Sequence, residues 1–190
     1  MRVIKRVRDM AQTAEQLRRH GETIGLVPTM GAFHDGHLSL IRAARKQTDV
    51  VIVSLFVNPL QFGPKEDFVR YPRNLSRDLA LAKREGTDLV FAPSAEEMYP
   101  AGFRTTIEVE ALSDQLEGVR RPGHFRGVAT VVAKLFHLTQ PTIAYLGQKD
   151  YQQAVIIKRM VEDLHLPVRL QVLPTVREAD GLAMSSRNAY

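Results

Sequence analysis

Short runs of apolar residues alternate with longer amphipathic segments along most of the chain. The clearest apolar run is VVIVSLFV at 50–57, and consecutive apolar positions are typical of a central parallel strand that is covered on both faces. Residues 36–48 follow an earlier short strand and place Leu38, Ile41 and Ala44 on one face of a helix. This alternation predicts parallel strands joined by helical crossovers, and therefore an α/β fold.

The same patterns predict the positions of the other elements. Strands are expected at 24–27, 88–92, 105–109, 142–146 and 168–173, and helices at 75–85, 127–138 and 151–164. The stretch 58–73 contains three prolines and one glycine without a period, so it is predicted to be a long loop after a central strand. Loops in that position commonly bind a ligand.

Length and charge narrow the class of protein. The 190 residues, 44% of them hydrophobic, are enough for one domain over 1–190 with a buried core. Lysine and arginine number 26 against 21 acidic residues, which gives a formal net charge of +5. Because the basic residues are dispersed and not gathered in an aromatic-interleaved stripe, we expect small anionic ligands and no nucleic-acid partner.

The chain contains no cysteine, which excludes disulfides, thiolate nucleophiles and cysteine-based metal sites. No window approaches the roughly 20 apolar residues of a membrane span, and the N-terminal residues lack the apolar stretch of a signal peptide. These features predict a cytoplasmic protein without membrane association.

The segment PTMGAFHDGH at 28–37 lies between the first predicted strand and its helix, where a doubly wound sheet places its nucleotide crevice. Gly31 and Gly36 allow close approach of the backbone, and a helix that begins near His37 offers N–H groups to phosphate. His34 and His37 are three residues apart, so both rings can lie on one side of the first helical turn and donate to phosphate oxygens. Such a pair alone is more often structural, but the glycines and the preceding strand favour a phosphate site.

Two further segments follow strands or loops and carry groups suited to phosphate. In GQKDYQQ at 147–153, Lys149 can reach phosphate from a strand end, while Asp150 either caps the next helix or serves the ligand. In MSSRN at 184–188, two hydroxyls beside an arginine suit a pyrophosphate, although such triplets are also common in mobile loops. The segments around Gln61 and His124 are weaker signals, because residues in such loops most often lie at the surface.

Together these segments closely resemble the pantothenate synthetase family, and the resemblance covers essentially the whole chain. The stretches that carry it, in order, are PTMGAFHDGH, VNPLQFGPKEDFVRYPR, RPGHFRGVATVV, GQKDYQQ and DGLAMSSRN. That family belongs to the nucleotidyltransferases that share a HIGH-type histidine motif and a later mobile basic loop with class I aminoacyl-tRNA synthetases. Here the two motifs correspond to 34–37 and 184–187. The resemblance implies a doubly wound, Rossmann-like parallel sheet.

The activity that the resemblance implies is an ATP-dependent, AMP-forming ligation of pantoate with β-alanine through a pantoyl-adenylate, giving pantothenate and pyrophosphate. Magnesium is expected to accompany ATP, with no protein ligand assigned to it. The family forms homodimers and continues into a smaller C-terminal domain. We therefore expect this chain to be the ATP-binding domain of a homodimer, and to be weakly active by itself.

The resemblance also assigns roles to individual residues. It makes His37 the catalytic proton donor. Because negative charge builds on the phosphates in such a reaction, fixed positive groups are also needed, and His34, His37, Lys149 and Arg187 are expected to supply them. Gln61 and Gln153 are expected to hold pantoate, with Gln61 also near β-alanine. The expected ATP site consists of Met30, Gly31, Ala32, Phe33, His34, Asp35, Gly36, His37, Gly147, Gln148, Lys149, Asp150, Val176, Met184, Ser185, Ser186 and Arg187.

Two alternatives stay open at the level of sequence. One is a different HIGH-motif adenylyltransferase that transfers AMP to a phosphate-containing acceptor, which the segments around Gln61 and Gln153 disfavour. The other is a non-catalytic nucleotide-binding domain, which needs the phosphate site but neither glutamine. No residue of these motifs is assigned as the base that deprotonates the β-alanine amine.

Overall fold

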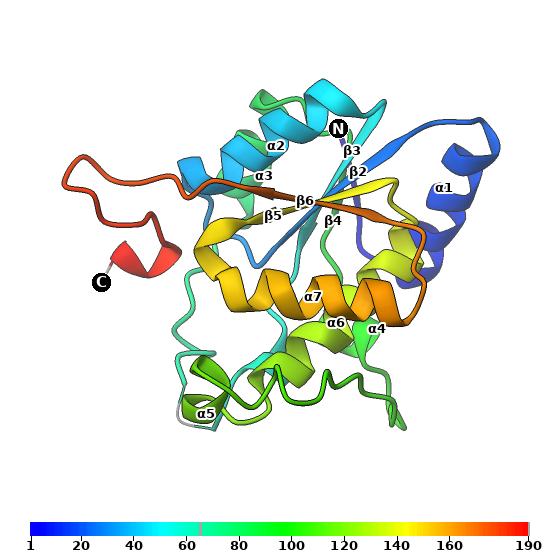
Figure 1. Cartoon of the computed structure of the whole chain (residues 1–190). Helices are drawn as coiled ribbons and strands as arrows, with labels where there is room; N and C mark the ends of the chain where they lie inside the picture. The colour runs from blue at the N-terminus through cyan, green and yellow to red at the C-terminus, as the bar shows by residue number, and fades with distance from the viewer. Residues whose placement is uncertain (65, 190) are drawn as a thin grey trace.

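A six-stranded parallel sheet forms the centre of the protein (Figure 1). The computed structural model describes residues 1–64 and 66–189. The strand order is β1-β4-β3-β2-β5-β6, and each neighbouring pair runs parallel. The strands are β1 (Arg2–Ile4), β2 (Ile24–Thr29), β3 (Val50–Leu55), β4 (Leu89–Phe91), β5 (Ile143–Gly147) and β6 (Arg169–Leu173).

Helices cover both faces of this sheet, as a doubly wound α/β fold requires. Residues of α1, α6 and α7 pack in one apolar cluster, and residues of α2 and α3 pack in another on the opposite face. The α-helices are α1 (Val7–Arg19), α2 (Asp35–Gln47), α3 (Leu75–Arg84), α4 (Ala95–Met98), α5 (Glu117–Arg120), α6 (His124–Thr139) and α7 (Tyr151–Asp163). Short 3₁₀ turns are η1 (Pro59–Gln61), η2 (Gln148–Asp150) and η3 (Ser186–Ala189).

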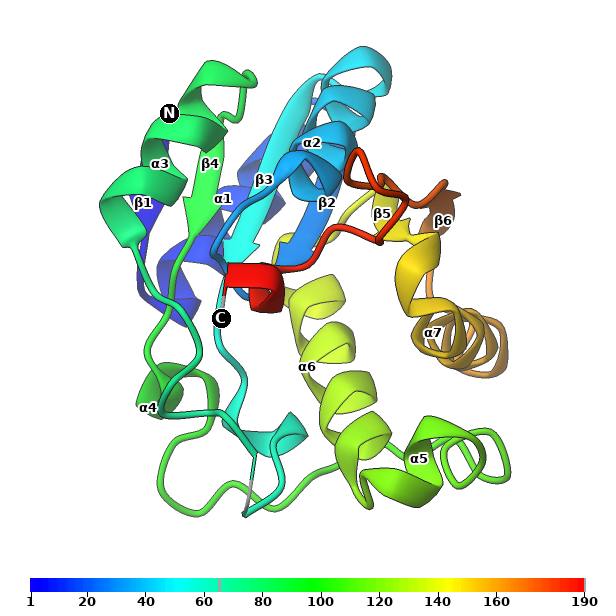
Figure 2. The ribbon, with the colours of Figure 1, turned by 90° about the vertical axis from the view of Figure 1, so that its left-hand side faces the viewer.

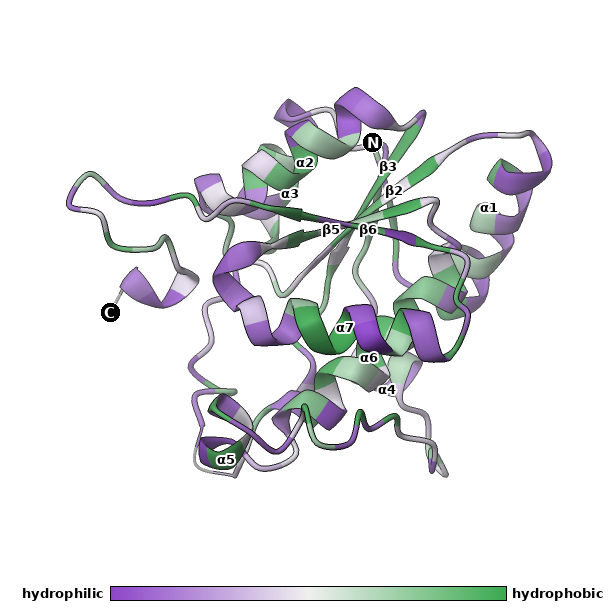
Figure 3. Ribbon diagram, viewed as in Figure 1, coloured by the Kyte–Doolittle hydropathy of each residue, from purple (hydrophilic) through white to green (hydrophobic). Residues whose placement is uncertain are grey.

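The central strands are apolar on consecutive positions because successive side chains enter different clusters. Ile52 belongs to the cluster beneath α6, whereas Val51 and Val53 belong to the cluster beneath α2. Figure 3 shows β2 and β3 largely in the hydrophobic colour, while α7 carries both colours. The run at 50–57 therefore has the two-sided burial that its composition predicted.

The strand order of the sheet reverses at β2, which is therefore a topological switch point. It continues from β2 through α2 to β3 on one side, while β5 pairs with β2 on the other side. Loops that leave the carboxyl ends of β2 and β5 therefore part in opposite directions, which opens a crevice at that edge of the sheet. The segment at 28–37 leaves β2 at this point, as expected.

The prediction of a strand at 105–109 is wrong. The backbone N–H of Ile107 donates to the hydroxyl of Thr130 on α6 at 2.9 Å, and Val109 is buried, so this segment packs on a helix and not in the sheet. The edge beside β4 is occupied by β1, which is too short to give a periodic signal. The other predicted strands and helices are confirmed within a few residues at their ends.

The N-terminal helix α1 was also missing from the expectations, although its sequence contains a signal. Met10, Ala14 and Leu17 recur at helical spacing and pack into the core cluster on the α6 face. A search for that spacing before the first strong strand would have found it.

One close backbone contact joins the long loop after β3 to α6. A Cβ atom added to Gly127 would overlap the carbonyl group of Leu60 and lie 2.7 Å from the backbone nitrogen of Gln61. Only glycine permits this approach, which places the η1 turn directly on the helix.

We expect Gly127→Ala to lower the free energy of unfolding by about 1–3 kcal/mol, because the added methyl group forces η1 away from α6. Urea denaturation followed by circular dichroism would measure the loss. Gly63→Ala is the matched control, since its nearest neighbour would be the flexible side chain of Glu66 at 3.5 Å. Equal stability of the two variants would contradict the assigned contact.

Candidate active site

A cleft of about 630 Å³ opens at the carboxyl edge of the sheet, where β2 and β5 part. Its walls come from segments that follow β2, β3, β5 and β6, so residues far apart in sequence meet here. The expected site residues that line it are Met30, His34, Gly36, His37, Gln61, Gly147, Lys149, Asp150, Gln153, Val176, Met184, Ser185, Ser186 and Arg187.

Five residues of the expected ATP site do not line this cleft. Phe33 is buried in the core between α2 and the sheet, with 1% of its surface exposed. The other four are Gly31, Ala32, Asp35 and Gln148.

The two histidines lie at the start of α2 with their rings in contact, at a centroid distance of 4.1 Å. The backbone N–H of Gly36 donates to Nδ1 of His34 at 3.2 Å, and the backbone N–H of His34 donates to Nδ1 of His37 at 3.4 Å. Since Nδ1 accepts in both rings, the proton of each neutral ring is on Nε2. Both rings therefore keep one N–H donor for a ligand, in agreement with the spacing argument.

Burial determines the charge of these rings. It lowers the pKa of His37 to about 3, with the neighbouring His34 ring and the Lys149 ammonium acting in the same direction. Burial also lowers the pKa of His34, and Lys149 lowers it further. Both rings are thus neutral near pH 7 and donate as imidazoles. The expectation that both histidines are positive groups is therefore wrong, and positive charge in the cleft comes from Lys149 and Arg187.

A carboxylate on α3 holds the turn that precedes the histidines. Asp78 accepts the backbone N–H of Ala32 at 2.8 Å and that of Phe33 at 2.9 Å, and only 2% of Asp78 is exposed. Gly31 and Ala32 both have positive φ, at 88° and 52°, which is unfavourable for alanine. The two charge-assisted hydrogen bonds from the turn to Asp78 stabilise this conformation.

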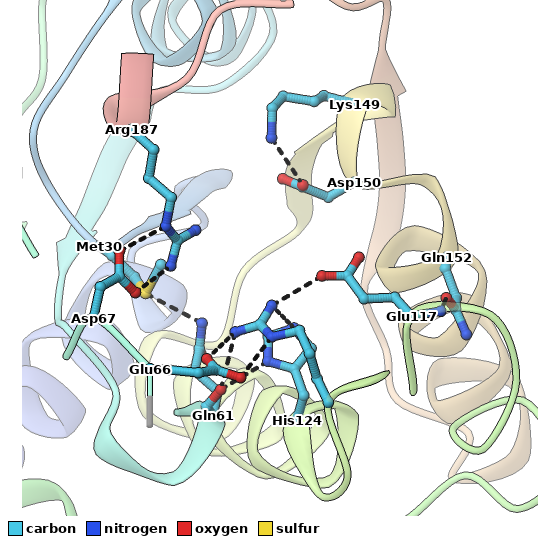
Figure 4. Close-up of polar contacts among 11 residues, drawn as sticks. Met30, Gln61, Glu66, Asp67, Glu117, His124, Lys149, Asp150, Gln152 and Arg187 are labelled. Atoms are coloured by element: carbon cyan, nitrogen blue, oxygen red, sulfur yellow. Dashed lines mark hydrogen bonds and ion pairs between the residues drawn. The ribbon is translucent and has the colours of Figure 1, made fainter. Parts of the chain in front are cut away.

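The segment after β5 differs in one detail from the expectation. Asp150 stands at the start of α7, but its side chain makes no capping hydrogen bond there. The carboxylate instead lies 3.2 Å from the Lys149 ammonium, and both residues line the cleft (Figure 4). Of the two roles left open for Asp150, capping is not seen, because the side chain turns to the neighbouring cation.

The C-terminal segment reaches across the cleft to two other loops. The hydroxyl of Ser186 donates to the carbonyl of Ala32 at 3.0 Å. The Arg187 guanidinium donates twice to Asp67, at 2.8 Å each, and lies 5.5 Å from the Tyr71 ring centroid (Figure 4). Figure 2 shows this turn, in red, beside the carboxyl ends of β2 and β3. A phosphate bound by Arg187 would have to share or replace the Asp67 contact.

The opposite wall is a partly buried polar network around Gln61 (Figure 4). The backbone carbonyl of Gln61 accepts from Nδ1 of His124 at 2.8 Å. Arg121 donates to both oxygens of Glu66, at 2.9 and 2.6 Å, and to Glu117 at 3.0 Å. Gln61 and His124 are each only 8% exposed. Neither lies at the surface, where residues in such loops are usually found.

Titratable groups of this network keep a defined charge. The hydrogen bonds from Arg121 hold the pKa of Glu66 below its usual range, so this carboxylate is ionised at neutral pH. Burial lowers the pKa of His124, which keeps its ring neutral. The wall therefore presents Gln61 beside a hydrogen-bonded network in which Arg121 pairs with two carboxylates.

Sequence reasoning missed three residues that support the site: Asn58, Asp78 and Arg121. Two of them carried a usable signal. Asn58 precedes a proline directly after the strongest predicted strand, a pair typical of turn initiation. Asp78 stands four residues before Ala82 on the buried face of α3, where an acidic residue needs a partner. Nothing in the local sequence distinguishes Arg121 from the neighbouring Arg120.

The parallel sheet, the cleft at its point of reversal and the paired histidines at a helix start define a Rossmann-like domain of the HIGH-motif type. Comparison with known proteins gives the family. The family model described as Pantoate-beta-alanine ligase matches residues 2–190, and the chain belongs to that family.

Similar proteins include a pantothenate synthetase from Moorella thermoacetica, which is 66% identical over 173 residues, covering 91% of this chain and 61% of that protein. One from Heliobacterium modesticaldum is 58% identical over 190 residues, covering 100% of this chain and 68% of that protein. The chain thus spans about three fifths to two thirds of the length of these relatives.

Solved structures of the family share the fold. A pantothenate synthetase from Thermus thermophilus has a TM-score of 0.95 at 56% identity, covering 100% of this chain and 67% of that one. A pantoate-beta-alanine ligase from Francisella tularensis, complexed with beta-gamma ATP and beta-alanine, also has a TM-score of 0.95, at 43% identity. The matched region covers 100% of this chain and 72% of that one.

Within the described residues, no helix is long and apolar enough to cross a membrane.

The buried histidine predicts a pH dependence of stability. The pKa of His37 is about 3 in the folded protein and 6.5 when exposed, so the unfolded chain binds more protons between these values. We expect the stability that depends on neutral His37 to be complete above about pH 6.5 and to fall, by up to about 1.4 kcal/mol per pH unit, towards pH 3. Urea denaturation at several pH values would measure this decrease. His37→Gln should show a shallower decrease, and parallel curves for the two proteins would refute the assignment.

Proposed function

We propose that this chain forms the ATP and pantoate site of an AMP-forming pantoate–β-alanine ligase. The observation that carries the proposal is the meeting, in one cleft, of two imidazole donors, a lysine and a serine-arginine segment with two glutamines. Family membership and the Francisella tularensis structure with beta-gamma ATP and beta-alanine support the same assignment.

ATP is assigned to the part of the cleft between the His34–His37 turn and the segments after β5 and β6. The start of α2 gives a positive dipole end, which favours an anion. Lys149 supplies positive charge from the facing wall, and Ser186 and Arg187 approach from the C-terminal segment. The other cleft residues proposed for ATP are Met30, Gly36, Gly147, Asp150, Val176, Met184 and Ser185. Gly31, Ala32, Phe33, Asp35 and Gln148 do not line the cleft, so we propose that they support the ATP site from the turns beside it.

In the first step, a carboxylate oxygen of pantoate bonds to the α-phosphorus of ATP as the bond to pyrophosphate breaks. Negative charge grows on the phosphate oxygens and on the departing pyrophosphate. The Nε2–H groups of His34 and His37 are fixed donors whose hydrogen bonds strengthen as that charge develops. His37 is proposed as the group that donates to the reacting phosphate.

Pantoate is assigned to Gln61 and Gln153, which lie on walls formed by η1 and α7. Neutral amides can hold the hydroxyl and carboxyl oxygens of pantoate. A bidentate arginine would neutralise the attacking carboxylate, whereas the amides do not. In the second step, the β-alanine amine bonds to the acyl carbon while the bond to AMP breaks and the amine loses a proton. Gln61 is proposed to contact both acceptor substrates.

Magnesium is expected to reach the site with the nucleotide. No group of three or more histidine, cysteine, aspartate or glutamate residues is arranged for a metal ion within 1–64 and 66–189. The carboxylates of Asp67 and Asp150 are paired with Arg187 and Lys149. These surroundings fit an ion that is held by phosphate oxygens and water, and whose chemistry is to neutralise phosphate charge. The homodimer that the resemblance implies stays a prediction.

Pantoate-dependent exchange of labelled pyrophosphate into ATP tests the function directly. We expect exchange with this chain, and a decrease of roughly 10²–10³ in its rate for His37→Ala with little change in ATP affinity, as for the loss of one fixed donor. Equal losses of rate and ATP affinity would remove His37 from its catalytic role. Exchange that needs a phosphate-containing acceptor would indicate another adenylyltransferase, and ATP binding without any exchange would indicate a non-catalytic domain.

The two glutamines make a separate prediction. Gln61→Ala and Gln153→Ala should weaken pantoate binding and leave ATP affinity nearly unchanged, because each amide is assigned only to the acceptor substrates. Calorimetric titration with each ligand would test this. A variant that loses ATP affinity and keeps pantoate affinity would place that glutamine on the nucleotide.

A further inference from the structure

The side chain of Asn58 lies between the Gln61 amide and a hydroxyl outside the cleft. Only 1% of Asn58 is exposed, and its amide makes four hydrogen bonds. Nδ2 donates to the carbonyl of Gly127 at 3.0 Å and to Oε1 of Gln61 at 3.1 Å. Oδ1 accepts the backbone N–H of Leu60 at 3.3 Å and the hydroxyl of Tyr99 at 2.8 Å.

Backbone partners determine which way the Asn58 amide faces. The Gly127 carbonyl can only accept and the Leu60 N–H can only donate, so Nδ2 must face Gly127 and Oδ1 must face Leu60. Gln61 must then turn its Oε1 towards Asn58. Its Nε2 faces the other way and lies 3.1 Å from Sδ of Met30, a residue of the cleft wall (Figure 4).

The direction of the Gln61 amide has a chemical consequence. With Oε1 occupied by Asn58, Gln61 presents N–H donors on its Met30 side. Such an arrangement favours a ligand with oxygen acceptors at this wall and disfavours one with donors. The hydroxyl and carboxylate oxygens of a small hydroxy acid fit this requirement.

We propose that Tyr99 is a positioning residue: its hydroxyl anchors the Asn58 amide in the orientation that the backbone partners select, and so stabilises the direction in which the Gln61 amide faces the cleft. This inference deepens the proposed function, since it rests on Gln61 as a contact of pantoate. Tyr99 is not among the described residues that line the cleft, so its effect on the ligand is indirect.

The surroundings of Tyr99 fit this role. Its ring lies 6.0 Å from that of Phe56 and 5.0 Å from that of Phe103, and the Lys134 ammonium stands 5.7 Å from the ring centroid. Burial raises the pKa of Tyr99, so the hydroxyl keeps its proton and remains a donor. Its bond is the shortest of the four at Asn58, whereas the Leu60 bond that would remain at Oδ1 is the longest.

The main test is Tyr99→Phe, which removes one oxygen and keeps the ring. We expect pantoate to bind about five- to tenfold more weakly, the effect of losing one neutral hydrogen bond, and ATP affinity to be unchanged. Lys134→Met is the matched control, because it alters the surroundings of the same ring and leaves its hydroxyl in place. It should leave pantoate affinity at the parent value.

A double-mutant cycle separates positioning from general loosening of the fold. In the Gln61→Ala background, Tyr99→Phe should cause no further loss of pantoate affinity, because the amide that it orients is absent. The inference would be overturned if the factors by which the two single variants weaken pantoate binding multiplied in the double variant. It would also be overturned if Tyr99→Phe weakened ATP binding as much as pantoate binding.

A second measurement needs no substrate. The measurement compares ¹H–¹⁵N spectra of the two variants with the spectrum of the parent chain. The side-chain amide signals of Asn58 and Gln61 should both shift in Tyr99→Phe and keep their parent positions in Lys134→Met. Unchanged signals in Tyr99→Phe would overturn the inference even if the parent binds pantoate. Absence of pantoate binding by the parent, with both signals moved by Tyr99→Phe, would refute the proposed function and leave the hydrogen-bonded chain supported.

Discussion

The Asp78 carboxylate is the contact on which the nucleotide side of the cleft depends. It accepts two adjacent backbone N–H groups, those of Ala32 and Phe33, from a turn that contains left-handed residues. That turn fixes where α2 begins, and the start of α2 fixes the tautomers of His34 and His37. Because Asp78 belongs to α3, which packs on the same face of the sheet as α2, the packing of the core and the geometry of the histidines are linked.

The other side of the cleft depends on the opposite face of the sheet. There the η1 turn lies against α6 at Gly127, and the Asn58 amide joins both to Gln61. The cleft therefore has two independently supported walls, one from the α2 side and one from the α6 side, which part at the end of β2. The segment after β5 completes both sides, since Lys149 is proposed for ATP and Gln153 for pantoate.

The sequence predicted most of what depends on local pattern. The apolar run of β3 and the two-histidine spacing were sufficient because strand burial and a first helical turn involve neighbours along the chain. Features that depend on distant partners were missed or wrong. Tyr99 and Asn58 are 41 residues apart, and 105–109 packs on α6 although its composition suits a strand.

The charge of the two histidines could not be predicted from spacing, because it depends on burial and on Lys149. Neutral rings can still stabilise the proposed transition state, as fixed N–H donors. A neutral N–H donor gains strength as charge grows on the phosphate. Bound phosphate would also raise both lowered pKa values, since its negative charge opposes the effect of Lys149. Nucleotide binding would then be accompanied by proton uptake when the pH falls towards the raised values.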